Sequence, residues 1–132
     1  MLSVHLFIHS LNAAEQVIDC LKKHPLAGTS ILHWFLGTKK QVQEATKHGC
    51  FFSVGPAMLN SNRGMKVASW IPPDRVLLET DGPFAKVDNS PLLPSQARVA
   101  VNELSLLWKV TAEDVVAQLK RNMVLLLNVG IT

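Results

Sequence analysis

Short runs of apolar residues alternate along the chain with segments whose apolar positions recur at helical spacing. Four apolar runs, at residues 2–9, 29–35, 50–55 and 76–80, are mostly flanked by Gly, Pro, Asn or Asp. Runs of this length between such residues are typical of buried β-strands. The sequence therefore predicts four strands.

The segments between these runs predict helices, because each has a residue suited to starting it and a residue suited to ending it. Asn12 is a candidate N-cap for a helix that Pro25 ends, and Thr38 is a candidate N-cap for a helix that Gly49 stops. A third, short helix ends at Trp70, because two prolines follow that residue directly.

Two more helices are expected after the fourth strand. One spans about residues 94–108, and the next opens with a capping box formed by Thr111 and Asp114. The expected apolar stripe of that last helix consists of Val115, Leu119, Met123 and Leu126.

The alternation of strand and helix decides the fold class. Four βα units in succession imply α/β architecture with parallel strands joined by right-handed crossovers. A complete (β/α)8 barrel takes about 250 residues, so residues 1–132 correspond to four of its eight units in one domain without an internal boundary. In such barrels the functional residues lie at the carboxyl ends of the strands.

Composition supports an ordinary folded domain and excludes several other classes. Hydrophobic residues make up 48% of the chain, enough for a core, yet no apolar stretch approaches the roughly 18 residues of a membrane helix. The start of the chain lacks the features of a signal peptide, so a cytoplasmic protein with no membrane partner is expected. The net charge of +3 tolerates a polyanionic substrate without requiring one. Cys20 and Cys50 have no metal-binding spacing, and we expect both to be buried thiols.

Three strands end in side chains that can bind a metal. His9 ends the first apolar run, His33 lies near the end of the second, and Asp81 follows the fourth. Because side chains alternate along a strand, His33 is expected to share a face with Phe35, and Asp81 with Glu79. A single strand-end histidine is more often a hydrogen-bonded structural group, but three such residues at one rim favour a divalent metal, Zn, Mg or Mn. Glu79 lies two residues deeper than Asp81, and we expect it to orient a ligand rather than to bind metal.

A polar loop offers a second candidate function. Arg63 and Asn62, preceded by Asn60 and Ser61, supply the guanidinium, amides and hydroxyl that usually contact phosphodiester oxygens. The alternative, a solvated loop, is equally compatible with this composition. Trp34, next to His33, is close enough in sequence to wall the metal site.

These motifs resemble the C-terminal half of the TatD family of metal-dependent deoxyribonucleases. The segments that match, in order and spacing, are Ile8-His9-Ser10, residues 31–37 and residues 77–84, which ends Glu79-Thr80-Asp81-Gly82-Pro83-Phe84. The resemblance implies that His9, His33 and Asp81 are metal ligands, that Asp81 is catalytic, and that DNA phosphodiesters are hydrolysed.

A more detailed comparison with the family gives one closer similarity and several differences. Residues 49–59 and Gly82 are more similar to the TatD-like nucleases of the Qat anti-phage defence system. The family's His-x-His motif and bridging glutamate have no counterpart here, and Leu11 and Leu36 replace its usual arginine and serine. The resemblance therefore implies a nuclease half that a complementary half-barrel chain completes. The alternative is an inactive truncated remnant or an oligomeric binding protein.

Overall fold

The structure, a computed structural model, describes residues 5–9, 13–24, 28–78, 86–87, 90–91 and 97–128. Its centre is a parallel four-stranded sheet in the order β1-β2-β3-β4. The strands are β1 (His5–His9), β2 (Thr29–His33), β3 (Phe51–Val54) and β4 (Val76–Leu78). The four expected strands and their parallel α/β arrangement are confirmed.

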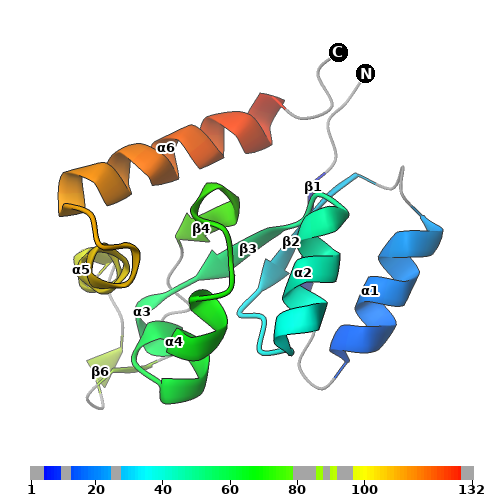
Figure 1. Ribbon diagram of the computed structural model, residues 1–132, viewed down its shortest axis with the longest axis horizontal. Coiled ribbons are helices and arrows are strands. Elements are labelled where there is room, and N and C mark those ends of the chain that lie inside the picture. Colours follow the sequence, from blue (N-terminus) through cyan, green and yellow to red (C-terminus); the bar gives the residue numbers. More distant parts are fainter. Residues whose placement is uncertain are drawn as a thin grey trace.

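The helices lie between and after the strands, as the alternation predicts. They are α1 (Ala14–Lys23), α2 (Lys39–Lys47), α3 (Pro56–Leu59), α4 (Asn62–Ala68), a 3-10 turn η1 (Pro73–Arg75), α5 (Ala97–Trp108) and α6 (Ala112–Asn128). Figure 1 shows α1 and α2 side by side, α3 and α4 next to them, and α6 running past β4. A two-stranded antiparallel ribbon of β5 (Lys86–Val87) and β6 (Ser90–Pro91) lies where only a loop was expected.

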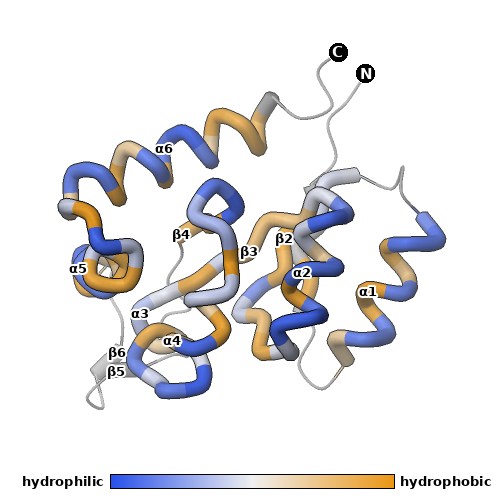
Figure 2. The backbone as a smooth tube through the Cα atoms, in the orientation of Figure 1, coloured by the Kyte–Doolittle hydropathy of each residue, from blue (hydrophilic) through white to orange (hydrophobic). Residues whose placement is uncertain are grey.

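One face of the sheet packs against helices and forms the main core. Leu32 and Phe52 from the strands are fully buried there together with Val42 of α2, Met58 of α3 and Leu104 of α5. Figure 2 shows that hydrophobic residues occur along the strands and recur at intervals along the helices. Leucine-sized and larger side chains removed from water in this way supply about 1.5 to 3 kcal/mol each.

The expected common face of His33 and Phe35 is wrong. Strand β2 ends at His33, and the next residue, Trp34, has a φ of 47°, which turns the chain out of the strand. Phe35 therefore joins the helix-side core, where its ring meets that of Phe52 edge to face at 5.8 Å. The alternation of side chains holds only as far as the strand continues.

The other face of the sheet carries a smaller buried cluster. Ile31, Phe51 and Leu77, from three different strands, are buried together with Leu126 of α6. The guanidinium of Arg75 lies 5.0 Å from the centre of the Phe51 ring, within the range of a cation–π interaction. The last helix thus reaches the face of the sheet that carries His33.

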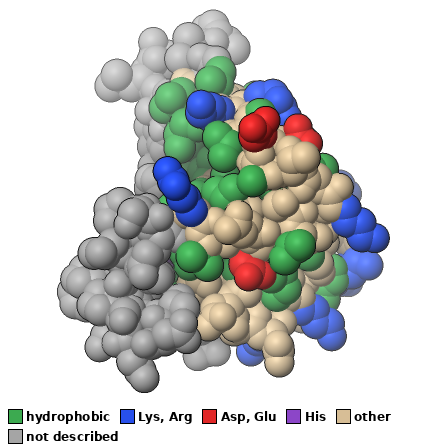
Figure 3. All heavy atoms as spheres, turned by 90° about the vertical axis from the view of Figure 1, so that its left-hand side faces the viewer, with side chains coloured by type: hydrophobic (Ala, Val, Ile, Leu, Met, Phe, Trp, Pro, Cys, Tyr) green, Lys and Arg blue, Asp and Glu red, His purple; other side chains and the backbone are tan. Residues whose placement is uncertain are grey.

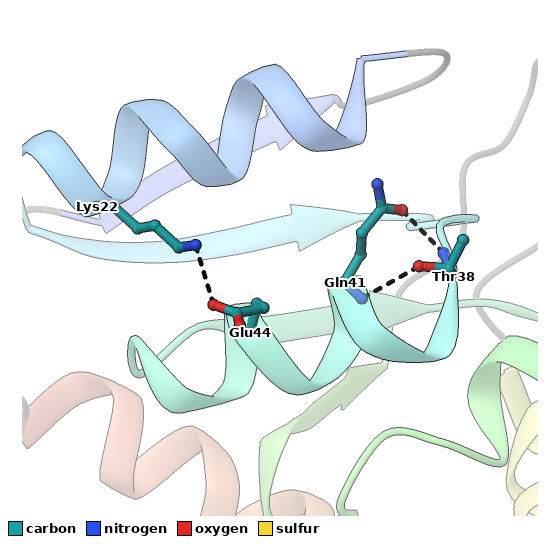
Figure 4. A network of polar contacts seen from close by, with 4 residues as sticks. All are labelled: Lys22, Thr38, Gln41 and Glu44. Atoms are coloured by element: carbon teal, nitrogen blue, oxygen red, sulfur yellow. Dashed lines mark hydrogen bonds and ion pairs between the residues drawn. The ribbon is translucent and has the colours of Figure 1, made fainter.

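The expected helix signals at α2 and α6 are confirmed. Thr38 and Gln41 form a reciprocal capping box at the start of α2, drawn in Figure 4, and Gly49 follows its end with a φ of 80°. Thr111 and Asp114 form the corresponding box before α6.

The apolar stripe of α6 differs from the expected one at one position. Val115, Leu119 and Leu126 pack inward, but Met123 is 44% exposed and Asn122 occupies the buried position instead. The Asn122 side-chain amide donates hydrogen bonds of 2.7 Å to the carbonyls of Pro73 and Val76, so the buried polar group is satisfied by the backbone that leads into β4.

Candidate metal and phosphate site

His33 ends β2 on the face of the sheet that carries the smaller cluster. The residue is buried, with 8% of its surface exposed. The pairing of the strands puts His9 of β1 beside it on one side and Ser53 of β3 on the other. Leu77 of β4 continues the same row. Two histidines and a serine therefore occupy equivalent positions on three adjacent strands.

The Ser53 hydroxyl lies 3.3 Å from Nδ1 of His33, at the long end of the hydrogen-bonding range. Ser53 is 2% exposed, so both groups are withdrawn from water. The backbone N–H of Trp34 donates to the Ser53 carbonyl at 3.1 Å, which ties the end of β2 to β3 just beyond the histidine. Sequence reasoning missed Ser53. The available signal was a lone hydroxyl inside the apolar run 50–55.

Trp34 borders this site and also belongs to the main core. Its ring centre lies 6.5 Å from that of His33, with the planes at 79°. It packs against the helix-side cluster and is partly buried. Trp34 therefore contacts the histidine from the helix side, where the strand has ended.

The other expected ligands are described only in part. His9 is described as the last residue of β1, by its backbone, whereas Asp81 and Glu79 lie outside the described residues. Within the described part of the chain, no group of three His, Cys, Asp or Glu side chains comes close enough to hold a metal. The backbone of the two histidines nevertheless suits a shared ion. Neighbouring strands lie about 4.8 Å apart, and imidazole nitrogens bind divalent metals at about 2.1 Å.

The expected polar loop is the N-terminus of α4 in the structure, with Ser61 as N-cap and Asn62 and Arg63 in the first turn, and it is tied to the same end of β2. Arg63 donates through Nη2 to the carbonyl of Leu36, three residues after His33, at 2.7 Å. Asn62 begins α4 and is exposed. Ser61 is already used, since its hydroxyl accepts from the Gly64 N–H and donates to the Met58 carbonyl, both at 2.9 Å. Arg63 and Asn62 thus keep donors for a phosphate, whereas Ser61 serves as the helix cap.

The two cysteines differ in burial. Burial raises the pKa of the Cys50 thiol to about 11, which makes it unreactive near neutral pH. Cys20 on α1 is exposed, so the expectation that both thiols are buried is wrong for this residue.

The described residues contain no helix long and apolar enough to cross a membrane.

Comparison with models of known protein families shows to which family the chain belongs. A family model described as "TatD related DNase" matches residues 2–128. The chain belongs to this family. Among its TatD relatives, "Uncharacterized metal-dependent hydrolase YabD" of Bacillus subtilis is 33% identical over 118 residues, which are 87% of this chain and 43% of the relative. "Deoxyribonuclease Tat-D" of Schizosaccharomyces pombe is 31% identical over 84 residues, 62% of this chain and 27% of the relative.

Solved structures share the fold. The crystal structure of the Escherichia coli TatD homologue YjjV matches with a TM-score of 0.80 at 24% identity, over 95% of this chain and 50% of that one. An uncharacterized amidohydrolase of Saccharomyces cerevisiae also gives 0.80, at 14% identity, over 94% of this chain and 54% of that one. The chain therefore spans about half of these folds, and less than half of the two curated relatives.

Proposed function

We propose that this chain is the C-terminal half of a TatD-type metal-dependent nuclease. The observation that carries the proposal is the pairing of His9 with His33 at the ends of adjacent parallel strands. The order of His9, His33 and Asp81 along the family match supports the same assignment. In this proposal these three residues bind a divalent metal, and Glu79 orients one of them.

Each residue has a role that its chemistry allows. A bound divalent cation lowers the pKa of water and polarises a phosphoryl oxygen. His9 and His33 offer neutral imidazole nitrogens, and the Asp81 carboxylate both binds the cation and accepts a proton from the attacking water. Arg63 and Asn62 orient the DNA backbone by donating hydrogen bonds to its phosphate oxygens.

The chain alone is expected to be inactive. Its relatives are about two to four times as long as the segment they share with it, and the family's other metal ligands have no counterpart here. Stabilising both the attacking and the leaving oxygen of a phosphodiester commonly takes two cations. In the proposal, the missing half of a (β/α)8 barrel comes from a complementary chain or a longer parent protein.

Exposed apolar surface on α6 supports association with such a partner. Met123, Val124, Leu125 and Leu127 are between 43% and 57% exposed on the helix that borders β4. Hydrophobic side chains gather beside Lys and Arg on the upper part of the face in Figure 3. Contiguous apolar surface of this kind marks interaction sites. Self-association would cover the same surface, and light scattering distinguishes the two by showing whether the isolated chain is monomeric.

The test is hydrolysis by the completed barrel. The chain is combined with a polypeptide carrying the four missing βα units of a TatD relative, and cleavage of a labelled DNA oligonucleotide is measured with manganese, zinc or magnesium. We expect no cleavage by the chain alone and metal-dependent cleavage by the pair. Asp81→Asn should abolish it, whereas Asp74→Asn, at an exposed aspartate of η1, should not. Cleavage that survives Asp81→Asn overturns the proposal, and a pair that associates but never cleaves favours an inactive remnant.

We further propose that the substrate is phage DNA in the cytoplasm, as in QatD, the nuclease of the Qat defence system. The support is the likeness of residues 49–59 and of Gly82 to that group. A plaque assay in cells that carry the rest of such a system, with wild type or Asp81→Asn, tests this. Equal plaque counts would remove the defence role and leave the nuclease proposal standing.

A further inference from the structure

We propose that Ser53 is a positioning residue for His33: its hydroxyl oxygen accepts a hydrogen bond from Nδ1–H of the imidazole and so leaves Nε2 as the nitrogen that binds metal. The inference rests on the proposed function, because it assigns a role within the same metal site.

The contact is built by the sheet and not by a mobile surface group. Ser53 and His33 are partners in the pairing of β3 with β2, so their Cα atoms are held side by side by the strand hydrogen bonds. The hydroxyl lies 3.3 Å from Nδ1, and both side chains are buried. The Trp34 N–H, bonded to the Ser53 carbonyl, fixes the backbone immediately after the histidine. A buried histidine held in this way has little freedom to turn its ring.

The direction of this hydrogen bond decides whether His33 can serve as a ligand. Neutral imidazole has one N–H and one nitrogen with a lone pair. If Nδ1 carries the proton, it donates to Ser53 and the lone pair lies on Nε2. If Nε2 carries the proton, Ser53 donates to Nδ1, so Nε2 has no lone pair for an ion and the lone pair of Nδ1 is used by Ser53. Partners of this kind fix the tautomer and orientation of metal-binding histidines.

The orientation is tested first without metal. Chain labelled with 15N in its histidine rings is examined by NMR near pH 8, above the ordinary histidine pKa of about 6.5, and His33→Gln identifies the signals of His33. We expect wild type to carry the proton on Nδ1. Ser53→Thr, which keeps a hydroxyl and suits a strand, should preserve this tautomer, and Ser53→Ala should shift it toward a mixture. A wild type protonated on Nε2, or a Ser53→Ala spectrum identical to wild type, overturns the proposal.

The control is Ser30→Ala, because Ser30 is also buried, 5% exposed, and its odd separation of three from His33 along β2 gives it the opposite strand parity. It should leave the His33 signals unchanged. If Ser53→Ala fails to fold, the wild-type tautomer and Ser53→Thr still decide the question.

The metal arm separates this inference from the proposed function. Zinc is titrated by calorimetry into wild type, Ser53→Thr, Ser53→Ala and Ser30→Ala. Loss of the partner that orients His33 should weaken zinc binding by about 10- to 100-fold, and only in Ser53→Ala. Equal affinities for wild type and Ser53→Ala overturn the role of Ser53 in metal binding. If zinc binds none of the chains while the spectra change as expected, the orientation by Ser53 stands and the proposed metal site fails.

Discussion

Phe51 and Phe52 are neighbours on β3, and both are fully buried, yet they belong to opposite faces of the sheet. Within the described part of the chain, Phe52 lies in a cluster of seventeen buried residues that includes side chains from six helices, whereas Phe51 lies in a cluster of four. Among the described residues, the first face is packed by the chain's own helices, and the second depends on Leu126 and Arg75. We infer that stability comes mainly from the first face and the proposed chemistry from the second.

The polar content of the two faces agrees with this division. His33 and Ser53 are buried on the same side as Phe51, and the side chains nearest them along their strands are Ile31 and Phe51. Buried polar groups cost free energy unless they are paired, and they are retained where they serve a purpose. The sheet therefore holds the groups of the proposed site on the face where, among the described residues, its own packing is thinner.

The largest expected effect comes from truncating Phe52. Phe52→Ala removes a ring that meets Phe35 at 5.8 Å inside the main core and should lower the free energy of unfolding by about 3 to 5 kcal/mol. Phe51→Ala should cost less, because its smaller cluster can collapse around the gap. Urea unfolding of the two variants gives the comparison directly. If Phe51→Ala costs as much as Phe52→Ala, the two faces contribute equally and the division is wrong.

The second largest effect is expected from the loss of Asn122, which connects the two faces. Asn122 is 1% exposed, lies four residues before Leu126 on α6, and donates to the carbonyls of Pro73 in η1 and of Val76 at the start of β4. Asn122→Leu keeps the size but leaves those carbonyls without their donor, and the buried Val76 carbonyl should account for most of a cost of about 1 to 3 kcal/mol. Hydrogen exchange should rise at Ile31 and Phe51 more than at Leu32. Uniform acceleration at all three would mean that α6 stabilises both faces alike.

The pKa of Cys50 gives a prediction that depends on pH. Burial in the main core raises the pKa of this thiol from 9.0 to about 11, so the unfolded chain loses the proton at a lower pH than the folded one. The resulting stabilisation, on the order of 2 kcal/mol, is present below pH 9 and is lost as the pH rises through about 11. The slope of unfolding free energy against pH should be shallower in Cys50→Ala than in wild type. Cys20→Ala, at an exposed thiol, should keep the wild-type slope.

The sequence allowed the parallel sheet and the helix boundaries to be predicted because those signals are local. Thr38, Gly49 and Thr111 act on residues within one turn, and the structure has each of them at a helix end. The wrong predictions occur where a contact between residues far apart in the sequence decides which side chain is buried. Asn122 is buried because carbonyls 46 and 49 residues earlier in the chain need its amide.

The candidate site was predictable only in part, for a related reason. A strand that ends in histidine is visible in the sequence, so His9 and His33 could be paired in advance. The turn at Trp34 was not visible, and it moved Phe35 to the other face. Ser53 became a candidate only when the register of β3 against β2 was known, since nothing in residues 50–55 alone indicates which residue they oppose.

The smallest expected effect is at the N-terminus of α2, which lies on the packed face. Thr38 accepts a hydrogen bond from the Gln41 N–H at 3.2 Å, and the Gln41 side chain accepts from the Thr38 N–H at 2.9 Å (Figure 4). Thr38→Ala removes the first bond and should cost about 1 kcal/mol in thermal or urea unfolding, with Lys39→Ala as an exposed neighbouring control. Because the cap supports only the helix side, Thr38→Ala should leave the His33 tautomer unchanged. If it shifts that tautomer as Ser53→Ala is expected to, the site depends on the helix side and not on the contact between β2 and β3.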